Sequence, residues 1–326
     1  MLGDATGIGP EISVKLLSSG AAASSARLAV IGDARVLELG MRDAGIEIPY
    51  QIHARLDDVS WPAESVPVID LANLDPASLT RGEISVESGR VCGETLKHMC
   101  DLALAGQLDG ICFAPLNKAA LHKGVGEFRD EHQMFASLTS HAGFFGEMNV
   151  IPEFATFRVT SHVALREAVN MVTPERIANA LRLADATLRD MGYDPPRIGV
   201  AALNPHCGEN GLFGDEEVTT IRPALGKLRA EGIDATGPIS SDTIFLRAKR
   251  GEFHGVVMMY HDQGQIATKL LGFNKGVTVT AGLKTVFTTP AHGTAFDILG
   301  QGKADPGALE HAVRLAATLA GAASRR

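Results

Sequence analysis

Aromatic residues and long apolar runs are both scarce in this chain. Its 326 residues include 13 Phe, 3 Tyr and 1 Trp, whereas Gly alone contributes 35. Many small residues with few aromatics favour an α/β protein with tight turns over a β-sandwich. No apolar run approaches the ~20 residues that cross a bilayer. The first residues also lack the basic and apolar regions of a signal peptide. We therefore expect a cytoplasmic protein with no membrane partner.

Cysteine and positive charge are also in short supply. Cys92, Cys100, Cys112 and Cys207 are the only cysteines, and none forms a CxxC pair. This spacing favours reduced thiols over a disulfide framework or a zinc knuckle. The 30 basic and 38 acidic residues give a net charge of −8. Because a nucleic-acid surface usually needs a basic excess, we expect a small-molecule partner instead.

Short apolar segments alternate with segments of helical spacing along the chain. The strand-like segments are 27–32, 110–115, 196–203 and 255–260, and the helical ones are 34–44, 85–105, 174–191 and 307–320. Such alternation predicts βαβ units and a mostly parallel sheet. In this architecture, functional loops lie at the carboxyl ends of the strands.

A glycine-rich segment, GDATGIGPE, occupies residues 3–11. Gly7 and Gly9 allow close approach of the backbone, and Pro10 suits the first turn of a helix. The segment can hold an anion or cofactor at a helix start, or it is a plain turn. A strand is expected to feed such a turn, yet only Met1 and Leu2 precede it. We therefore expect this sequence to begin downstream of that strand.

Three histidines each follow an apolar, strand-like run. His162 closes FRVTSH, His206 follows VAALNP and His261 follows VVMMY. Ends of strands in one sheet converge in space, and three imidazoles with an open fourth position form a catalytic site of the zinc type. Asp262, beside His261, is a candidate ligand or orienting partner. Alternatively, each histidine caps its own strand.

Two further segments suggest ligand binding. The segment AHGTAFDILGQGKAD over 291–305 places a Gly-rich loop, a hydroxyl and a carboxylate before a helix. Backbone N–H groups there suit phosphate, and Asp297 suits a hydroxyl. The alternative is a simple helix cap at Thr294. Lys269, in an apolar setting, is either an anion anchor or a surface lysine.

Taken together, these segments resemble the 4-hydroxythreonine-4-phosphate dehydrogenase family. The resemblance runs over nearly the whole chain and is greatest to the D-threonate and D-erythronate 4-phosphate dehydrogenases of that family. The GDxxGIGPE and HGTAxDI segments are also similar to the wider isocitrate and isopropylmalate dehydrogenase fold. The segments that carry the resemblance are 3–11, 114–121 (APLNKAAL), 160–166 (TSHVALR), 203–217 (LNPHCGENGLFGDEE), 259–273 (MYHDQGQIATKLLGF) and 291–305.

The resemblance implies a two-lobed α/β/α homodimer with mostly parallel sheets and an active site at the dimer interface. Residues 130–284 would form a metal and substrate lobe, inserted into a cofactor lobe of residues 1–129 and 285–326. NAD or NADP would take a hydride from a secondary alcohol, and the oxo product would then lose CO2. His162, His206 and His261 would hold a divalent metal, commonly zinc, with Mg, Mn or Co as alternatives. Some of these ligands would come across the dimer.

The resemblance also implies roles for other residues. Lys269 would bind substrate, and the candidate proton acceptors are Asp242, Asp262 and Lys269. The candidate cofactor-binding residues are Gly7, Gly9, His292, Gly293, Thr294 and Asp297.

The substrate end departs from the family pattern. The usual GHTE motif is here Asp130-Glu131-His132-Gln133, an Asn is replaced by Thr278, and an Arg is replaced by Phe287. Losing a guanidinium and gaining a carboxylate weakens an anion site. We therefore expect Glu131, His132, Thr278 and Phe287 to contact an altered substrate.

Three classes of function compete for this sequence. The first is a dehydrogenase for a 4-phosphorylated four-carbon acid, with a dehydrogenase for the cis-dihydrodiol of an aromatic dicarboxylate such as terephthalate as its alternative. The second is an acyltransferase on a similar scaffold, which gives the three histidines no role. The third is a non-catalytic ligand-binding homologue.

Overall fold

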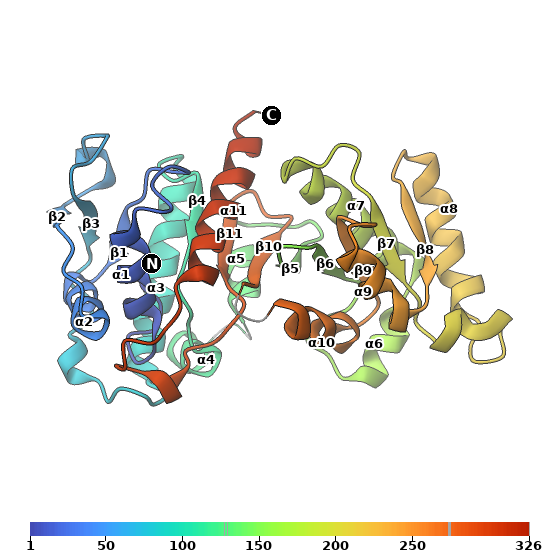
Figure 1. The fold of residues 1–326 in the computed structure, drawn as a ribbon, viewed down its shortest axis with the longest axis horizontal. Helices are drawn as coiled ribbons and strands as arrows, with labels where there is room; N and C mark the ends of the chain where they lie inside the picture. The colour runs from blue at the N-terminus through green and yellow to red at the C-terminus, as the bar shows by residue number, and fades with distance from the viewer. Residues whose placement is uncertain (127, 129, 273–274, 326) are drawn as a thin grey trace. The chain divides into compact units, whose positions relative to one another are not determined.

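The computed structural model describes residues 1–126, 128, 130–272 and 275–325, so Phe273, which closes the 259–273 segment, lies outside it. The chain divides into two compact units (Figure 1). Unit 1 contains Met1–Ala142 and Leu283–Arg325, and unit 2 contains Gly143–Gly282. The sequence placed the first boundary at residue 129. The difference arises because α5 (Glu131–Leu138) buries Met134 and Phe135 in the core of unit 1.

The first sheet of unit 1 has the parallel order β1-β3-β2. Its strands are β1 (Val30–Gly32), β2 (Tyr50–His53) and β3 (Val66–Asp70). Helices α1 (Gly9–Ser19) and α2 (Ala34–Ala44) pack against each other, and each ends at a left-handed glycine. Short 3-10 turns occupy Leu56–Asp58 and Pro76–Ser78.

Asp33 begins α2 and ties it to a neighbouring loop. Its carboxylate accepts hydrogen bonds from the Arg35 amide at 2.9 Å, the Leu74 amide at 2.8 Å and the Arg35 guanidinium. Burial opposes ionisation of this group, but these hydrogen bonds outweigh it and lower the pKa of Asp33. The helix start is therefore stabilised by a carboxylate that stays charged.

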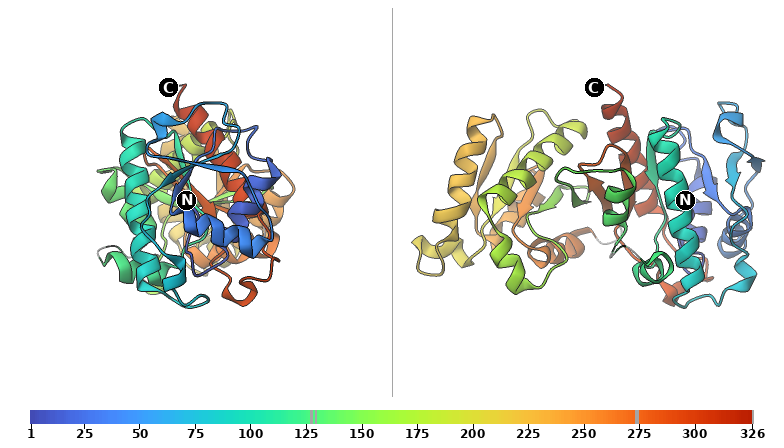
Figure 2. Two further views of the ribbon diagram at one scale, coloured as in Figure 1. Left: turned by 90° about the vertical axis from the view of Figure 1, so that its left-hand side faces the viewer. Right: turned by 180° about the vertical axis from the view of Figure 1, so that it is seen from behind.

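The rest of unit 1 is built on β4 (Gly110–Cys112) and β11 (Val286–Pro290), which pair in parallel. Residues alternate across β4 and its extension: Ile111 and Phe113 join one apolar cluster, and Cys112 and Ala114 join another. Helix α3 (Val86–Leu104) packs against β4, and so does helix α11 (Gly307–Ala323). Figure 1 shows this part of unit 1 from one side, and the right-hand view of Figure 2 shows it from the opposite side. Helix α4 (Lys118–Val125) packs along α3.

Unit 2 contains one sheet segment with the order β10-β5-β6-β9-β7-β8. Strands β6, β9, β7 and β8 are parallel, whereas β10 and β6 both run antiparallel to β5. The strands are β5 (Gly146–Val150), β6 (Ala155–Arg158), β7 (Ile198–Ala201), β8 (Ala235–Ile239), β9 (Gly255–Met258) and β10 (Val277–Ala281). Every residue of β6, β7, β9 and β10 is buried, as expected for a sheet covered on both faces.

The helices of unit 2 follow its strands in βα order. They are α6 (Leu165–Met171), α7 (Pro174–Asp190), α8 (Arg222–Ala230), α9 (Ser241–Lys249) and α10 (His261–Gly272), with a π-turn over Glu217–Ile221 and a 3-10 turn over Pro205–Asn210. The predicted helices at 34–44, 174–191 and 307–320 are confirmed, to within a few residues at their ends, as α2, α7 and α11. The expected α/β class with mostly parallel pairing is also confirmed.

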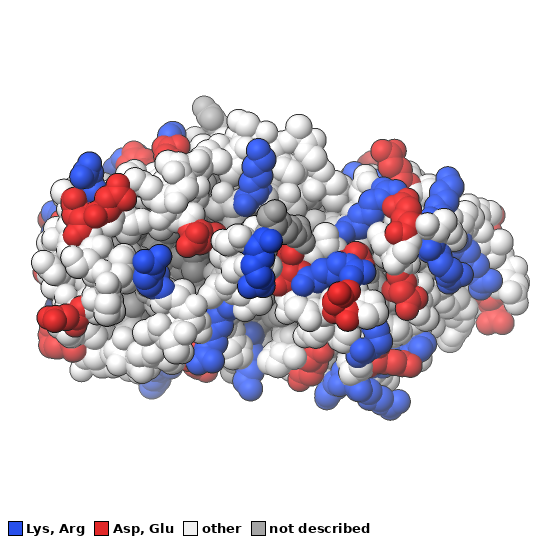
Figure 3. Space-filling view, turned by 90° about the horizontal axis from the view of Figure 1, so that it is seen from above, with Lys and Arg blue, Asp and Glu red and all other residues white. Residues whose placement is uncertain are grey.

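In the described residues, no helix is long and apolar enough to cross a membrane. On the face shown in Figure 3, basic side chains are interspersed with acidic ones.

Candidate active site

The predicted site residues fall in both units, and each unit brings several of them together. Unit 1 holds the expected cofactor residues, together with Glu131, His132 and Phe287. Unit 2 holds the three histidines, together with Asp242, Asp262, Lys269 and Thr278.

The three histidines of unit 2 follow three adjacent parallel strands. His162 follows β6, His261 follows β9 and His206 follows β7, and β9 lies between the other two. The rings of His162 and His261 lie side by side, with their centroids 5.3 Å apart. His206 is exposed on its own loop, with a positive φ of 51°. Within the described part of the chain, no group of three or more possible metal ligands is assembled.

His261 is held in one orientation by its neighbour. Its Nδ1 lies 2.6 Å from Oδ1 of Asp262. Burial lowers the pKa of His261, and the Asp262 carboxylate opposes this only in part. The ring is therefore neutral at pH 7. In the tautomer that donates to Asp262, Nε2 keeps its lone pair for a cation or a substrate proton.

A buried ion pair lies next to His162. Oε2 of Glu147 is 3.7 Å from Nε2 of His162 and 3.0 Å from Nη1 of Arg158. Nη2 of Arg158 also donates to Gln265 of α10 at 2.8 Å and to Oδ1 of Asn149. These contacts connect the end of β6 with β5 and α10, and they place a carboxylate beside the candidate ligand.

Thr278 belongs to this same buried network. It lies on β10, and its hydroxyl accepts a hydrogen bond from Nδ2 of Asn149 at 2.9 Å. Because Asn149 also contacts Arg158, Thr278 is linked through Asn149 to the ion pair beside His162. Thr278 is therefore part of the buried network behind His162, and its contact with a ligand stays a prediction.

The loop that carries His206 is fixed by a buried carboxylate. Glu217 is fully buried, and its Oε1 accepts hydrogen bonds from the amides of Leu203 at 2.8 Å and Asn204 at 2.7 Å. Residues 206, 207, 209 and 210 all have positive φ in this tight loop. The backbone before His206 is thus held firmly, while its side chain stays exposed.

The remaining candidates in unit 2 lie on exposed turns of helices. Asp242 is in the first turn of α9, which follows β8, and Asp262 is in the first turn of α10. Lys269 is in the last turn of α10, and its side chain is exposed. All three side chains are exposed, and that of Asp262 also contacts the His261 ring.

In unit 1, the glycine-rich turn and the predicted cofactor loop pack together. The Ile8 amide donates to the Thr294 carbonyl at 3.1 Å. A Cβ at Gly7 would lie 2.6 Å from Cβ of Thr294, and one at Gly9 would lie 2.4 Å from the Leu2 carbonyl oxygen. Both glycines are buried, so the structure gives each of them a packing role. Contact of Gly7 and Gly9 with a cofactor stays a prediction.

The segment after the predicted cofactor loop (residues 292–297) is tied to α1 by a charged pair. Oε1 of Glu11 accepts from the Ala304 amide at 3.0 Å and lies 2.7 Å from Nζ of Lys15. Lys15 also donates to the carbonyls of Gly302 and Ala304.

The predicted cofactor loop itself precedes these contacts in the chain. Gly293 and Asp297 are exposed, and His292 is half-buried, with its Nδ1 3.1 Å from the Gly293 carbonyl oxygen. Residues 302–304 are thus held against α1, whereas Gly293 and Asp297 are exposed and accessible to a ligand.

Two predicted substrate residues of unit 1 are buried on α5. Glu131 and His132 are 3% and 6% exposed, and Nζ of Lys118 lies 3.3 Å from the Glu131 carboxylate. The carboxylate that replaces a neutral family residue is thus countered by a lysine. Any ligand that reaches Glu131 would meet this charged pair.

Phe287 is placed differently from our expectation. Its ring is 1% exposed and stacks on Phe135, with centroids 4.0 Å apart and planes within 9°. Both rings belong to the main apolar cluster of unit 1. The residue therefore presents no surface to a ligand in this structure. The reason is that β11 is a buried strand packed against α5.

Comparison with known proteins agrees with the expected resemblance. A model of the family described as pyridoxal phosphate biosynthetic protein PdxA matches residues 24–316. This chain belongs to the PdxA family. The D-threonate 4-phosphate dehydrogenase of Cupriavidus necator is 41% identical over 320 residues, which cover 98% of this chain and 96% of that protein.

Solved structures of PdxA proteins are similar over the same length. The 4-hydroxythreonine-4-phosphate dehydrogenase of Klebsiella pneumoniae has a TM-score of 0.84 and 38% identity, with 98% of each chain covered. A terephthalate 1,2-cis-dihydrodiol dehydrogenase of Burkholderia xenovorans is more distant. Its TM-score is 0.65 and its identity is 26%, with 97% of this chain and 96% of that chain covered.

The sequence did not reveal the buried charged residues that hold the segments carrying the histidines of this PdxA-family protein. Glu147, Arg158 and Glu217 are buried charges, and nothing in their spacing distinguishes them from surface residues. The signal for Glu11 and Lys15 was present as an i,i+4 pair at the start of a predicted helix, next to the glycine turn.

Proposed function

We propose that this chain is an NAD(P)- and metal-dependent dehydrogenase of the cytoplasm. Its substrate would be a 4-phosphorylated four-carbon hydroxy or amino acid, of the 4-hydroxythreonine 4-phosphate or threonate 4-phosphate type. The secondary alcohol would be oxidised, and the oxo acid would then lose CO2. The observation that carries this proposal is the pairing of His162 and His261 at the ends of adjacent strands. The similarity to a D-threonate 4-phosphate dehydrogenase supports the substrate class.

The residues present fit a divalent cation. Two imidazoles lie side by side, and the donation of Nδ1 of His261 to Asp262 leaves Nε2 as a ligand. His162 and His261 would hold a divalent metal such as zinc, which would supply Lewis acidity at the alcohol of the substrate. The imidazole nitrogen donors suit Zn or Co better than Mn or Mg.

The position of His206, the third predicted ligand, leads to a proposal about a second copy of the chain. His206 is exposed, and its loop is held by Glu217. We propose that the site is completed in a homodimer, in which ligands from both copies meet. Two half-sites per chain would then form two whole sites per dimer.

The chain's own residues would orient the reactants and move the proton. Asp262 fixes the His261 ring, and the Glu147–Arg158 pair holds the end of β6 beside His162. Asp242, Asp262 and Lys269 are exposed candidates for accepting the alcohol proton.

In unit 1, the rim of the cofactor loop would bind the nicotinamide dinucleotide. The predicted contacts are His292, Gly293 and Asp297, together with Thr294, which is buried behind them and packs on the Gly7 turn. A nicotinamide dinucleotide held there would supply the hydride acceptor.

An assay of nicotinamide reduction tests this proposal. After chelation, activity with 4-hydroxythreonine 4-phosphate and threonate 4-phosphate is measured with added Zn, Mn or Mg. We expect His261→Ala to lose at least ~100-fold activity and Asp262→Asn to weaken metal affinity about 10- to 100-fold. His98→Ala, on α3 of unit 1, is the matched control and should match wild type. Full activity in chelated protein would contradict the metal proposal.

A second candidate is a cis-dihydrodiol dehydrogenase for an aromatic dicarboxylate. It is favoured by Thr278 and Phe287, which replace an Asn and an Arg, and by the similarity to the terephthalate dihydrodiol enzyme. Turnover of a dihydrodiol, with no turnover of either phosphorylated acid, would favour this candidate. If the protein binds a ligand but reduces no cofactor on any substrate, it is the non-catalytic homologue.

A further inference from the structure

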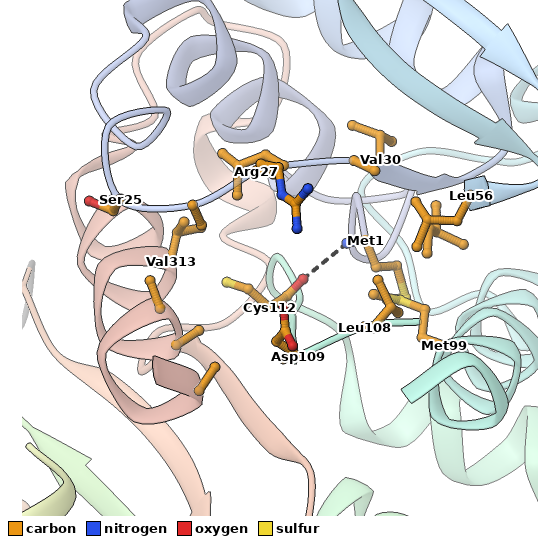
Figure 4. Close-up of a pocket in the computed structure, with 18 of the residues that line it drawn as sticks. Met1, Ser25, Arg27, Val30, Leu56, Met99, Leu108, Asp109, Cys112 and Val313 are labelled. Atoms are coloured by element: carbon orange, nitrogen blue, oxygen red, sulfur yellow. Dashed lines mark hydrogen bonds between the residues drawn. The ribbon is translucent and has the colours of Figure 1, made fainter. Parts of the chain in front are cut away.

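Unit 1 contains a cavity of about 620 Å³ whose lining residues are mostly apolar (Figure 4). Its described lining includes Leu56, Leu108 and Val313, and it includes none of the predicted catalytic, substrate, cofactor or metal residues. The cavity therefore takes no part in the proposed site. In unit 2, by contrast, charged side chains are buried directly beside the pair of histidines.

The Glu147 carboxylate lies almost within coordination distance of a cation bound to His162. Its Oε2 is 3.7 Å from Nε2 of His162, and the side chain is only 9% exposed. Two ligands of one tetrahedral zinc, each about 2.1 Å from the metal, lie about 3.4 Å from each other. A small movement would therefore make Glu147 a ligand of any cation that His162 holds. Because carboxylate oxygens are ordinary zinc ligands, Glu147 would compete with the substrate for the metal.

Arg158 holds both oxygens of this carboxylate. Its Nη1 lies 3.0 Å from Oε2 of Glu147, and its Nη2 donates to Oε1 at 3.1 Å. The guanidinium side chain is 2% exposed, so little water competes for either charge. Such a paired contact fixes the plane of the carboxylate as well as its position. Within the described part of the chain, Glu147 is not arranged with the histidines as a group of three possible ligands.

The guanidinium is itself fixed from three other segments. Nη2 of Arg158 donates to Oε1 of Gln265 on α10 at 2.8 Å and to Oδ1 of Asn149 on β5. Nη1 donates at 3.2 Å to the hydroxyl of Ser161, the residue before His162. Because these contacts come from several directions, the guanidinium cannot follow a carboxylate that turns toward a cation. The position of Glu147 is therefore set by a rigid partner.

The two charges of this pair also oppose each other at the second histidine. Burial is the main cause of the lowered pKa of His261. Arg158 adds to this lowering and Glu147 opposes it, so both charges act on the His261 ring. Without the guanidinium, an uncompensated negative charge would lie beside both imidazoles and would attract a cation.

We propose that Arg158 is a positioning residue that keeps the Glu147 carboxylate off the metal of the proposed dehydrogenase. This inference rests on the proposed function, because it concerns the cation that His162 and His261 would hold. A catalytic metal site keeps an open position for its substrate, whereas a site closed by protein ligands is structural. By pairing with Glu147, Arg158 leaves that position to the alcohol of the substrate.

Cobalt binding to the full chain tests this proposal. After chelation, Co²⁺ affinity is measured by titration calorimetry, and the coordination of the ion is followed by its visible absorption. Arg158→Gln should bind Co²⁺ at least about tenfold more tightly than wild type, because it releases a negatively charged ligand. Its absorption spectrum should change, because an oxygen ligand is added. Turnover of the phosphorylated acids should fall at the same time, whereas a purely structural role would not raise metal affinity.

Three further variants serve as controls. Adding Glu147→Gln to Arg158→Gln removes both charges and should return the Co²⁺ affinity to that of wild type. Arg176→Gln also removes one positive charge near the end of β6, but Arg176 donates to the Val159 carbonyl instead of to Glu147, so its affinity should not change. Arg158→Lys keeps the charge without the paired contact and should show a smaller gain. It decides the test if circular dichroism shows that Arg158→Gln does not fold.

The outcomes separate this inference from the proposed function. Unchanged or weaker Co²⁺ affinity in the folded Arg158 variants would overturn the inference alone, since the ion pair would then only support His162. An equal gain in Arg176→Gln would also overturn it, because the gain would reflect charge and no added ligand. If the wild-type chain binds no cobalt, the proposed metal dependence is contradicted, and this inference fails with it.

Discussion

Phe287→Arg is the substitution in which the resemblance and the structure predict opposite results. The family pattern places an arginine at this position, so restoring it should favour a phosphorylated substrate. In the structure, the Phe287 ring is buried on β11 and stacked on Phe135. We therefore predict that Phe287→Arg destabilises unit 1 before any gain in phosphate binding appears.

The size of this effect follows from the surroundings of the ring. Removing the packing of a buried Phe costs about 3–5 kcal/mol, and a stacked aromatic pair accounts for about 0.5–1.5 kcal/mol beyond its buried area. A guanidinium with no carboxylate partner adds several kcal/mol, or it forces β11 and α5 apart. A loss of roughly 5 kcal/mol is comparable with the whole stability of a domain, about 5–15 kcal/mol. At 2–4 °C for each kcal/mol, Tm should fall by more than ~10 °C.

The assay uses the single tryptophan of the chain. Trp61 packs against the same apolar cluster as Phe287, so its fluorescence during thermal or urea unfolding reports this core. Phe287→Leu keeps the site apolar and should cost about 1–1.5 kcal/mol. The reasoning is refuted if Phe287→Arg melts within ~3 °C of wild type and binds threonate 4-phosphate more tightly.

Three other predictions test separate features. Gly7→Ala should raise KM for the nicotinamide cofactor and lower Tm, because its Cβ would meet Thr294, whereas Gly293→Ala, with no atom within 4 Å of the added Cβ, should keep wild-type stability. Asp33→Asn should lose about 1–2 kcal/mol of unfolding free energy at pH 7. The folded pKa of Asp33 is lowered, so this difference should persist above about pH 4 and vanish as acid protonates the wild-type carboxylate in urea titrations at each pH. Burial raises the pKa of the Cys100 thiol to about 12, so Cys100 should react with a disulfide reagent at pH 7 only after unfolding, and fast labelling of the native chain would contradict this.

The helices and strands could be predicted from the sequence wherever local periodicity and end signals agree. Helix α7 begins at Pro174 after the Thr173 cap, and α2 begins after Asp33. The boundary of unit 1 could not be predicted, because it depends on which core buries α5. That choice is made by the contact of Phe135 with Phe287, two residues far apart in sequence.

The glycine-rich turn could be recognised from the sequence, but the reason for its glycines could not. Gly7 and Gly9 need small side chains, and sequence alone allows either a ligand or a neighbouring backbone as the reason. The structure supplies the neighbours, Thr294 and Leu2. The same logic applies to Glu147 and Arg158, whose roles depend on a pairing between β5 and β6 that no local pattern reveals.

The order of the strands in the sheet determines which histidine lies next to His162. In sequence, His206 is nearer to His162 than His261 is, and equal weight for all three is the natural prediction. In the sheet, β9 lies between β6 and β7, because the chain crosses over to β7 and β8 before it returns. The neighbour of His162 is therefore His261, with Asp262 as its orienting carboxylate. His206 follows the strand beyond, on a loop fixed by Glu217, and within the described residues it is not grouped with the other two histidines as a set of metal ligands. That all three histidines bind one metal stays a prediction.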